Sequence, residues 1–337
     1  MKDNLLVLAL PGILLSLLLS TGGYFISKHH PLLDAFFIAF LGAVIVGSLF
    51  GKKAWLWVGT GLCKDLLIPV GLFLYGTQIN LKKWALVDTS AFLICLINIV
   101  LYFVVIFLCN RYLFQIKNAK LSFLTGGASG ICGVSATAVF IPFVDAKEDE
   151  VASTLLAVVI TGLVSVFATW YIIQQNMAFI TSQYATLTGS TLNQTGAVKA
   201  AAGFMSKEAA SSALLLKFFR TSLIIPVALV LMFLSYTFSQ EEVSRETKFS
   251  AIKYGIFIAI LFFGGSLLFT FTGLHSYAGS VKPWFQILFG MTLASVGLLC
   301  NLRKAMKKEL LLNVISSILG WVAVAAGATL MVKRWID

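Results

Sequence analysis

The stretch 124–142, LTGGASGICGVSATAVFIP, constrains the fold most, because it places several glycines inside a long apolar run. A glycine in a helix interior costs about 1 kcal/mol relative to alanine, so a simple membrane helix gains nothing from four of them. Exposed polar backbone at membrane depth is tolerated only where it is buried in protein or lines a watery cavity. We therefore predict that a discontinuous helix breaks at 125–135. Close packing of small residues between helices is the alternative. The candidate ligand residues of the predicted break are Ser129, Gly130, Cys132, Gly133 and Ser135.

The half-helix that begins near Ser135 would direct free N–H groups and a positive dipole end into the protein. Such a helix start is suited to binding an anion. A second polar stretch, 186–205, TLTGSTLNQTGAVKAAAGFM, predicts a second broken or re-entrant element. Within it, Asn193, Gln194 and Thr195 are candidate donors to an oxyanion. Alternatively, they cap the helix that follows.

The composition places the chain in a lipid bilayer. Of its 337 residues 59% are hydrophobic and 12% charged, and the mean hydropathy is +0.93, whereas soluble domains carry about 25% charged residues. We predict an all-α integral membrane protein of about 10–11 transmembrane helices with two discontinuous, crossing helices. It would form one transporter domain over 1–337, with an extra N-terminal helix at 5–30 and helical halves at 32–173 and 186–332.

Several function classes are disfavoured by what the sequence lacks. The net charge of +11 is scattered among short loops, which indicates membrane orientation rather than nucleic-acid binding. Five cysteines form no CxxC pair and three histidines add no metal spacing, so we expect no metal and no cofactor. No nucleophile-elbow, zinc-protease or phosphate-loop motif is present, so we do not expect an enzyme.

Three basic residues fall in or beside the second polar stretch: Lys199, Lys217 and Arg220. A charge at membrane depth is a functional hypothesis by default. Lys217 and Arg220 are three residues apart and therefore share a helix face. They would form a positive wall beside a bound anion. The alternatives are an ion pair or carbonyl contact that ties helices together, or snorkelling to the interface.

Two motifs, found in this order, carry a resemblance to a known family. They are Gly130-Ile-Cys-Gly133-Val-Ser135-Ala and Lys217-Phe-Phe-Arg220-Thr221 followed by Ile225-Pro226, and the helix around Gly71–Leu81 adds to them. They resemble a family of bacterial membrane proteins named for sulfate export, itself similar to sodium/proton antiporters and bile-acid symporters. The resemblance implies inverted repeats and two crossed broken helices. Where that family tends to have a His-Asp-Thr type sequence, this chain has Asn193-Gln194-Thr195, so Lys199 would have to carry any proton coupling.

Two short internal echoes also favour inverted repeats. Leu124-Thr-Gly126 resembles Leu187-Thr-Gly189, and Gly76–Lys83 resembles Gly297–Lys304. The two echoes do not give one consistent repeat order, so either a span is miscounted or one echo arises by chance.

These observations predict a secondary transporter of a small sulfate-like or sulfonate-like oxyanion, working by alternating access in a bacterial inner membrane. The expected partners are a small inorganic or organic anion and the lipid bilayer, with a homodimer left open and no nucleic acid. A cation/proton antiporter on the same fold would need a carboxylate at mid-membrane, and none is evident in the sequence. A membrane sensor that does not transport is the other alternative.

Overall fold

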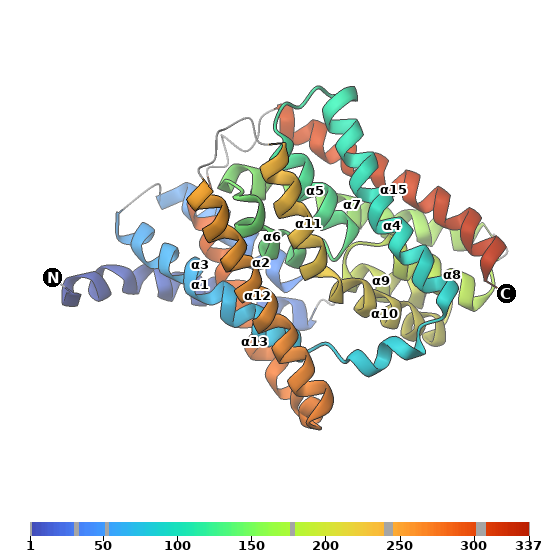
Figure 1. Ribbon diagram of the computed structural model, residues 1–337, viewed down its shortest axis with the longest axis horizontal. Helices are drawn as coiled ribbons and strands as arrows, with labels where there is room; N and C mark the ends of the chain where they lie inside the picture. The colour runs from blue at the N-terminus through green and yellow to red at the C-terminus, as the bar shows by residue number, and fades with distance from the viewer. Residues whose placement is uncertain are drawn as a thin grey trace. The chain divides into compact units, whose positions relative to one another are not determined.

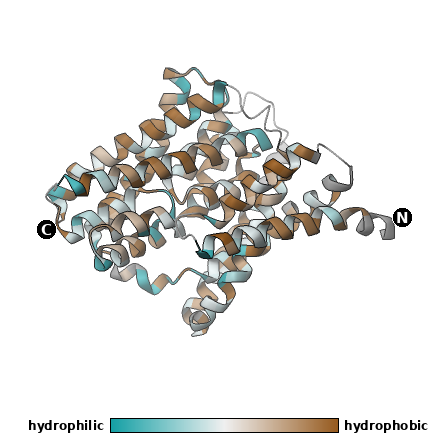
Figure 2. Cartoon of the chain, turned by 180° about the vertical axis from the view of Figure 1, so that it is seen from behind, coloured by the Kyte–Doolittle hydropathy of each residue, from teal (hydrophilic) through white to brown (hydrophobic). Residues whose placement is uncertain are grey.

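The computed structural model describes residues 2–29, 34–50, 54–175, 179–238, 245–300 and 308–336, and in these ranges it contains helices and no strand. Six helices are long and apolar enough to cross a membrane, or seven if one bent pair is a single span. Figure 2 shows hydrophobic residues along the described helices and many of the hydrophilic ones toward helix ends and connections. The chain is therefore an all-α integral membrane protein, as predicted. The count of 10–11 spans and the inverted repeats remain predictions.

The chain divides into two compact units, and each contains segments from both predicted halves. Unit 1 comprises 1–81, 147–152 and 245–306, and unit 2 comprises 82–146, 153–244 and 307–337. The helices of unit 1 are α1 (Lys2–His29), α2 (Ala35–Phe50), α3 (Ala54–Thr77), α12 (Arg245–Phe271) and α13 (Ala278–Leu299), with the short 3-10 helix η3 (Leu274–Tyr277). The 3-10 helix η1 (Leu81–Leu86) follows α3 across the boundary between the units.

Unit 1 is built on continuous helices that approach one another closely. α13 packs on α2 and α3, and α12 packs on α3. A Cβ added at Gly297 of α13 would lie 2.7 Å from the Phe40 carbonyl oxygen, so only glycine permits this approach of α13 to α2. Nearby, the rings of Tyr75 and Phe285 stack with centroids 4.8 Å apart. Residues 301–304 of the predicted echo Gly297–Lys304 lie outside the described residues.

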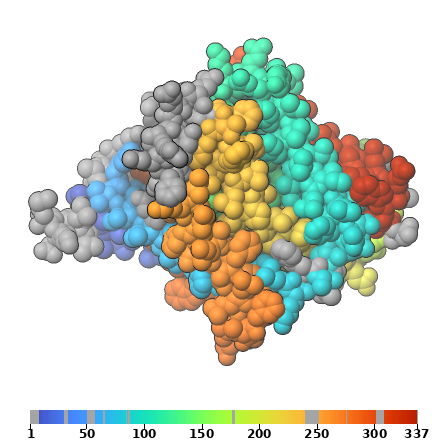
Figure 3. Space-filling model, in the orientation of Figure 1, coloured from blue at the N-terminus to red at the C-terminus, as the bar shows by residue number. Residues whose placement is uncertain are grey.

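Unit 2 contains the interrupted helices. Its elements are α4 (Thr89–Leu108), the π-helical turn η2 (Cys109–Leu113), α5 (Ala119–Gly130), α6 (Val134–Val144), most of α7 (Glu148–Gln174), α8 (Thr181–Thr191), α9 (Thr195–Gly203), α10 (Lys207–Ser222), α11 (Ile224–Thr237) and α15 (Lys308–Trp335). α4 packs on α5 and α15, and α10 packs on α8 and α9 (Figure 1). Figure 3 shows α4 and α11 at the surface. Val100 of α4 and Phe233 of α11 expose apolar side chains, as lipid-facing residues do.

Both predicted interruptions are confirmed, but each spans only three residues. α5 continues through Gly130 and α6 begins at Val134; α8 ends at Thr191 and α9 begins at Thr195. The predicted break over 125–135 was therefore too wide. A Cβ at Gly126 or Gly130 would lie 3.2–3.3 Å from backbone atoms of α4, so these helical glycines allow close packing. The packing alternative holds for them, and the broken-helix prediction holds for Gly133.

Candidate functional site

The two breaks, Ile131–Gly133 and Leu192–Gln194, lie side by side within unit 2, and we call them the double break. Gly133 has φ +69° and ψ −107°, a conformation that residues with a Cβ rarely adopt. A Cβ built there would lie 3.5 Å from the Asn193 carbonyl oxygen and 3.6 Å from Cγ of Gln194. The predicted proximity of the two interruptions is therefore confirmed, and the positive φ of Gly133 sets the backbone course of the first break.

Arg220 of α10 joins the carbonyl ends of both broken helices. At α5, its Nε donates to the Gly130 carbonyl at 2.5 Å and its Nη2 to the Ser129 carbonyl at 2.7 Å. At α8, its Nη1 donates to the carbonyls of Ser190 at 2.8 Å and Leu192 at 2.9 Å. The guanidinium is fully buried, with its Cζ 5.6 Å from the Tyr102 ring centroid. One side chain thus satisfies carbonyls that helix ends leave without partners.

Lys217, one turn earlier on the same face of α10, makes a similar connection. Its Nζ donates to the carbonyls of Ile131 at 2.6 Å, Asn193 at 2.8 Å and Leu192 at 3.1 Å. Three donated bonds require three N–H groups, so the geometry is that of an ammonium. Of the alternatives that the sequence left open, the carbonyl contact is the arrangement seen for both cations.

Helix α4 adds neutral contacts to the same helix end. The Tyr102 hydroxyl donates to the Thr191 carbonyl at 2.5 Å, and the Asn98 amide donates to Oγ of Ser190 at 3.0 Å. Neither residue is among those predicted from the sequence. Asn98 was detectable, because an amide in the middle of a long apolar run is rare without a reason.

On the opposite side of each break a new helix begins without a side-chain cap. Neither Gly133, before α6, nor Gln194, before α9, makes a side-chain capping bond. The first intrahelical bonds run from Thr137 N to the Gly133 carbonyl and from Val198 N to the Gln194 carbonyl. The N–H groups of 134–136 and 195–197 precede these bonds and form the positive ends of α6 and α9. The predicted helix starts near Ser135 and Thr195 are thus confirmed.

Two buried amides beside these helix starts are incompletely paired. Asn193 is 1% exposed and Gln194 7% exposed. Nδ2 of Asn193 donates to the Val158 carbonyl at 3.1 Å, while Oδ1 of Asn193 and Nε2 of Gln194 have no hydrogen-bond partner. Both unpaired atoms face Gly162 of α7, where an added Cβ would lie 3.2 Å and 3.1 Å from them. Gly162 leaves room for the two amides, and it is not among the residues predicted from the sequence.

The remaining candidate residues divide into two groups. Cys132 and Ser135 are buried, with Sγ and Oγ 2.8 Å apart across the first break, and the Ser129 hydroxyl lies 3.3 Å from that of Ser317 on α15. By contrast, Thr195 and Lys199 of α9 are exposed. The structure thus brings together the residues of both breaks with Lys217 and Arg220, and it places Lys199 at the surface of unit 2.

The charges around the double break do not cancel. In the described part of unit 2 the carboxylates are all exposed: Asp88, Asp145, Glu208 and Glu309. A helix end carries about half an elementary charge, negative at the carbonyl ends of α5 and α8 and positive at the starts of α6 and α9. These four ends offset one another, which leaves the two positive charges of Lys217 and Arg220. No group of three potential metal ligands occurs among the described residues.

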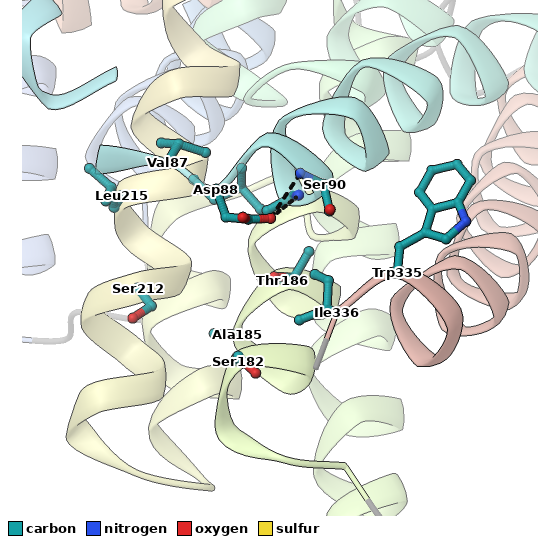
Figure 4. Close-up of a pocket in the computed structure, with 12 residues that line it drawn as sticks. Val87, Asp88, Ser90, Ser182, Ala185, Thr186, Ser212, Leu215, Trp335 and Ile336 are labelled. Carbon is teal, nitrogen blue, oxygen red and sulfur yellow. Dashed lines mark hydrogen bonds between the residues drawn. The ribbon is translucent and has the colours of Figure 1, made fainter. Parts of the chain in front are cut away.

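A cavity of about 580 Å³ opens within unit 2 between α4, α8, α10 and the end of α15 (Figure 4). Its lining includes the Asp88 carboxylate and Trp335, together with the hydroxyl groups of Ser90, Ser182, Thr186 and Ser212. Leu216, another lining residue, immediately precedes Lys217 in α10, and Thr186 lies one helical turn before Ser190 in α8. Along α8 the cavity therefore ends between one and two turns before the double break, and along α10 it ends next to Lys217, which binds the double break.

Comparisons with known proteins identify relatives over most of the chain. The family described as Conserved hypothetical protein 698 matches residues 11–316. A UPF0324 membrane protein of Archaeoglobus fulgidus is 29% identical over 84% of this chain and 81% of its own length. A UPF0324 membrane protein of Streptococcus pneumoniae is 27% identical over 93% of each chain, and one of Bacteroides thetaiotaomicron is 26% identical over 76% of this chain and 77% of its own. No solved structure matches the chain.

Proposed function

Since this chain belongs to the family described as Conserved hypothetical protein 698, whose relatives here are named membrane proteins, we propose that it is a secondary transporter of a small oxyanion. The substrate would bind at the double break, against the starts of α6 and α9. Transport would proceed by alternating access. The proposed location is the inner membrane of a bacterium. Interrupted helices that direct backbone groups at a substrate are a recurring design among such transporters.

One observation carries this proposal: two buried cations lie at the double break, and the described carboxylates of unit 2 are exposed. The carbonyls that Lys217 and Arg220 bind satisfy hydrogen bonds but carry no full charge. An anion beside the uncapped helix starts would offset this positive charge and accept bonds from the N–H groups there. A sodium ion would be repelled by the two cations, and the carbonyls at the ends of α5 and α8 that could coordinate it already accept from Lys217 and Arg220. The cation/proton antiporter is therefore less well supported than the anion carrier.

The cavity in Figure 4 favours a transporter over a membrane sensor that does not transport. Its polar lining suits a hydrated ion, and it extends toward the double break along α8 and α10. The Asp88 carboxylate in this lining caps α4 by accepting from the N–H groups of Ser90 and Ala91. We propose that it is part of the access route from one membrane surface. Sulfate or a sulfonate, suggested by the sequence resemblance, matches the positive charge at the double break in sign.

A thermal-shift screen of purified protein tests the anion class, because a ligand that binds only the folded state raises its stability. We expect stabilisation by at least one of sulfate, thiosulfate, sulfite, phosphate, sulfonates or carboxylates, at constant ionic strength. The matched variant is Gly162→Ala, whose added Cβ would crowd the Asn193 and Gln194 amides; the shift should disappear. A shift with sodium or lithium and with no oxyanion would overturn the proposal.

Proton coupling through Lys199 is a separate part of the proposal. Lys199 is exposed on α9, just over one turn after Thr195, and no histidine or carboxylate occurs in the second break. In proteoliposomes, Lys199→Met should abolish the response of anion flux to a pH gradient, while Lys207→Met, also at an exposed lysine, should not. Wild-type flux that ignores the gradient would rule out coupling and leave the anion site standing.

A further inference from the structure

The orientation of the Asn193 amide is fixed by its neighbour. The Val158 carbonyl can only accept a hydrogen bond, so the atom 3.1 Å from it must be the amide nitrogen of Asn193. Oδ1 then points away from Val158 and has no donor. Gln194 has no bond that fixes its amide, and it presents a donor and an acceptor in either orientation. The double break therefore contains at least one buried acceptor whose position is determined.

A buried acceptor without a donor is costly, and such atoms are few in native proteins. Here Oδ1 of Asn193 lies 3.2 Å from the point where a Cβ on Gly162 would stand, so glycine allows this acceptor to approach α7 closely without gaining a donor there. The surrounding groups that could bind an anion are donors: the N–H groups at the starts of α6 and α9. An acceptor among donors discriminates between anions that carry a hydrogen-bond donor and anions that carry none.

We infer that the anion bound at the double break carries a hydrogen-bond donor of its own. This rests on the proposed function. A protonated oxyanion, or a small acid with a hydroxyl or amino group, can donate to Oδ1 of Asn193 while its oxygens accept from the helix starts. Fully deprotonated sulfate has only acceptors, and it would leave Oδ1 desolvated and facing an anionic oxygen. Sites built to bond a hydroxyl reject analogues that lack it far better than apolar pockets reject a methylene.

Two matched pairs of anions test this inference. Hydrogen phosphate and sulfate are both tetrahedral dianions in mildly alkaline buffer, and only the first carries a proton. Glycolate and propionate have the same number of non-hydrogen atoms, and only glycolate carries a hydroxyl. Titration calorimetry on purified protein should give at least one pair in which the donor-bearing anion binds tenfold or more tightly, since an unsatisfied buried acceptor changes affinity by roughly 5-fold to 150-fold. The pair that shows the preference tells a protonated oxyanion from a hydroxy acid.

Two variants connect the preference to one atom. Asn193→Leu removes the acceptor, so the ratio within the pair should fall to about threefold or less. Asn98→Leu removes another buried amide whose oxygen is unpaired, next to Ser190, and should leave the ratio unchanged. Equal or tighter binding of sulfate and propionate by the wild type, or an equal effect of both variants, would overturn the inference and leave the anion site intact. If none of the four anions binds and the thermal-shift screen finds an oxyanion without a donor, the inference fails and the anion site stands; if no oxyanion binds in either experiment, the proposed function fails as well.

Discussion

Two asparagines of unit 2 are almost equally buried, yet their surroundings differ. Asn313 of α15 is fully buried, and each end of its amide is paired. Its Nδ2 donates to Oγ1 of Thr125 at 3.0 Å and to Oγ of Ser153 at 3.1 Å. Its Oδ1 accepts from Nδ2 of Asn110 at 3.1 Å. This saturated cluster joins α5, α7, η2 and α15.

Asn193 is 1% exposed and makes a single bond, to the Val158 carbonyl. Its Oδ1 has no partner. A satisfied buried network specifies packing, whereas an unsatisfied group calls for an explanation outside packing. The comparison teaches that burial alone does not separate structural from functional amides. The hydrogen-bond pairing of each amide end separates structural from functional amides. It predicts opposite effects on stability and anion binding when Asn313 and Asn193 are each replaced by leucine.

The largest effect should come from the cation that both breaks share. Arg220→Met removes four hydrogen bonds and leaves the carbonyls of Ser129 and Gly130 buried without that donor. Charge-assisted bonds contribute about 1.5–3 kcal/mol each, so we expect a loss of at least about 4 kcal/mol in the free energy of unfolding. Denaturant unfolding in detergent measures this loss.

Arg220→Lys is the matched control, since it keeps the charge and loses the planar fork. It should fall between the wild type and Arg220→Met. If Arg220→Met is as stable as the wild type but binds no anion, the guanidinium serves the ligand rather than the ends of α5 and α8. That result would weaken the division between structural and functional groups.

Asn313→Leu should come second. It deprives Asn110 of the acceptor for its Nδ2 and removes two further bonds within the cluster. Leaving a buried donor unpaired costs about 1–3 kcal/mol, and we expect about 2–4 kcal/mol in all. Anion affinity, measured on the folded fraction by calorimetry, should stay within about twofold of the wild type. A large drop in affinity would place Asn313 among the ligand-binding groups and break the comparison.

Gly133→Ala should have a smaller effect on stability. At φ +69° and ψ −107° a Cβ is strained, and such conformations cost about 1–3 kcal/mol. The control is Gly203→Ala at the end of α9, where an added Cβ meets nothing within 4 Å, and this variant should be neutral or slightly stabilising. Thermal unfolding of both variants gives the difference. Equal stability would show that the first break does not depend on the glycine backbone.

Much of this arrangement could be predicted from local sequence. Gly133 followed by hydroxyl residues predicted the start of α6, and the bracketed polar run predicted the start of α9 at Thr195. These are short-range effects of glycine and of polar residues in an apolar context. The same reasoning made the first break too wide, since Gly126 and Gly130 serve the approach of α4, which is distant in sequence.

The pairing of particular atoms could not be predicted in this way. Lys217 and Arg220 were recognised as sharing a face, but which carbonyls they bind depends on how α10 packs on α8 and on how far their side chains reach toward α5. Gly162 carried no signal, because a single glycine in an apolar helix is common in membranes. Asn313 and Asn98 both stand out in apolar runs, and the sequence cannot distinguish the saturated amide from the unsaturated one.

Asn193→Leu should change stability least, although it alters a side chain as buried as Asn313. The variant loses one bond to Val158, whose carbonyl lies within α7 and can pair with the helix backbone. It also removes an acceptor whose desolvation already destabilises the folded state by about 1–3 kcal/mol. We therefore expect a free energy of unfolding within about 1 kcal/mol of the wild type, or slightly higher, together with weaker binding of donor-bearing anions. Such a gain in stability with a loss of function is the usual signature of a site that retains a destabilising group for its ligand. Denaturant unfolding of Asn193→Leu and Asn313→Leu in parallel provides the measurement. If Asn193→Leu loses as much stability as Asn313→Leu, the Asn193 amide belongs to the fold, and the contrast between the two asparagines does not hold.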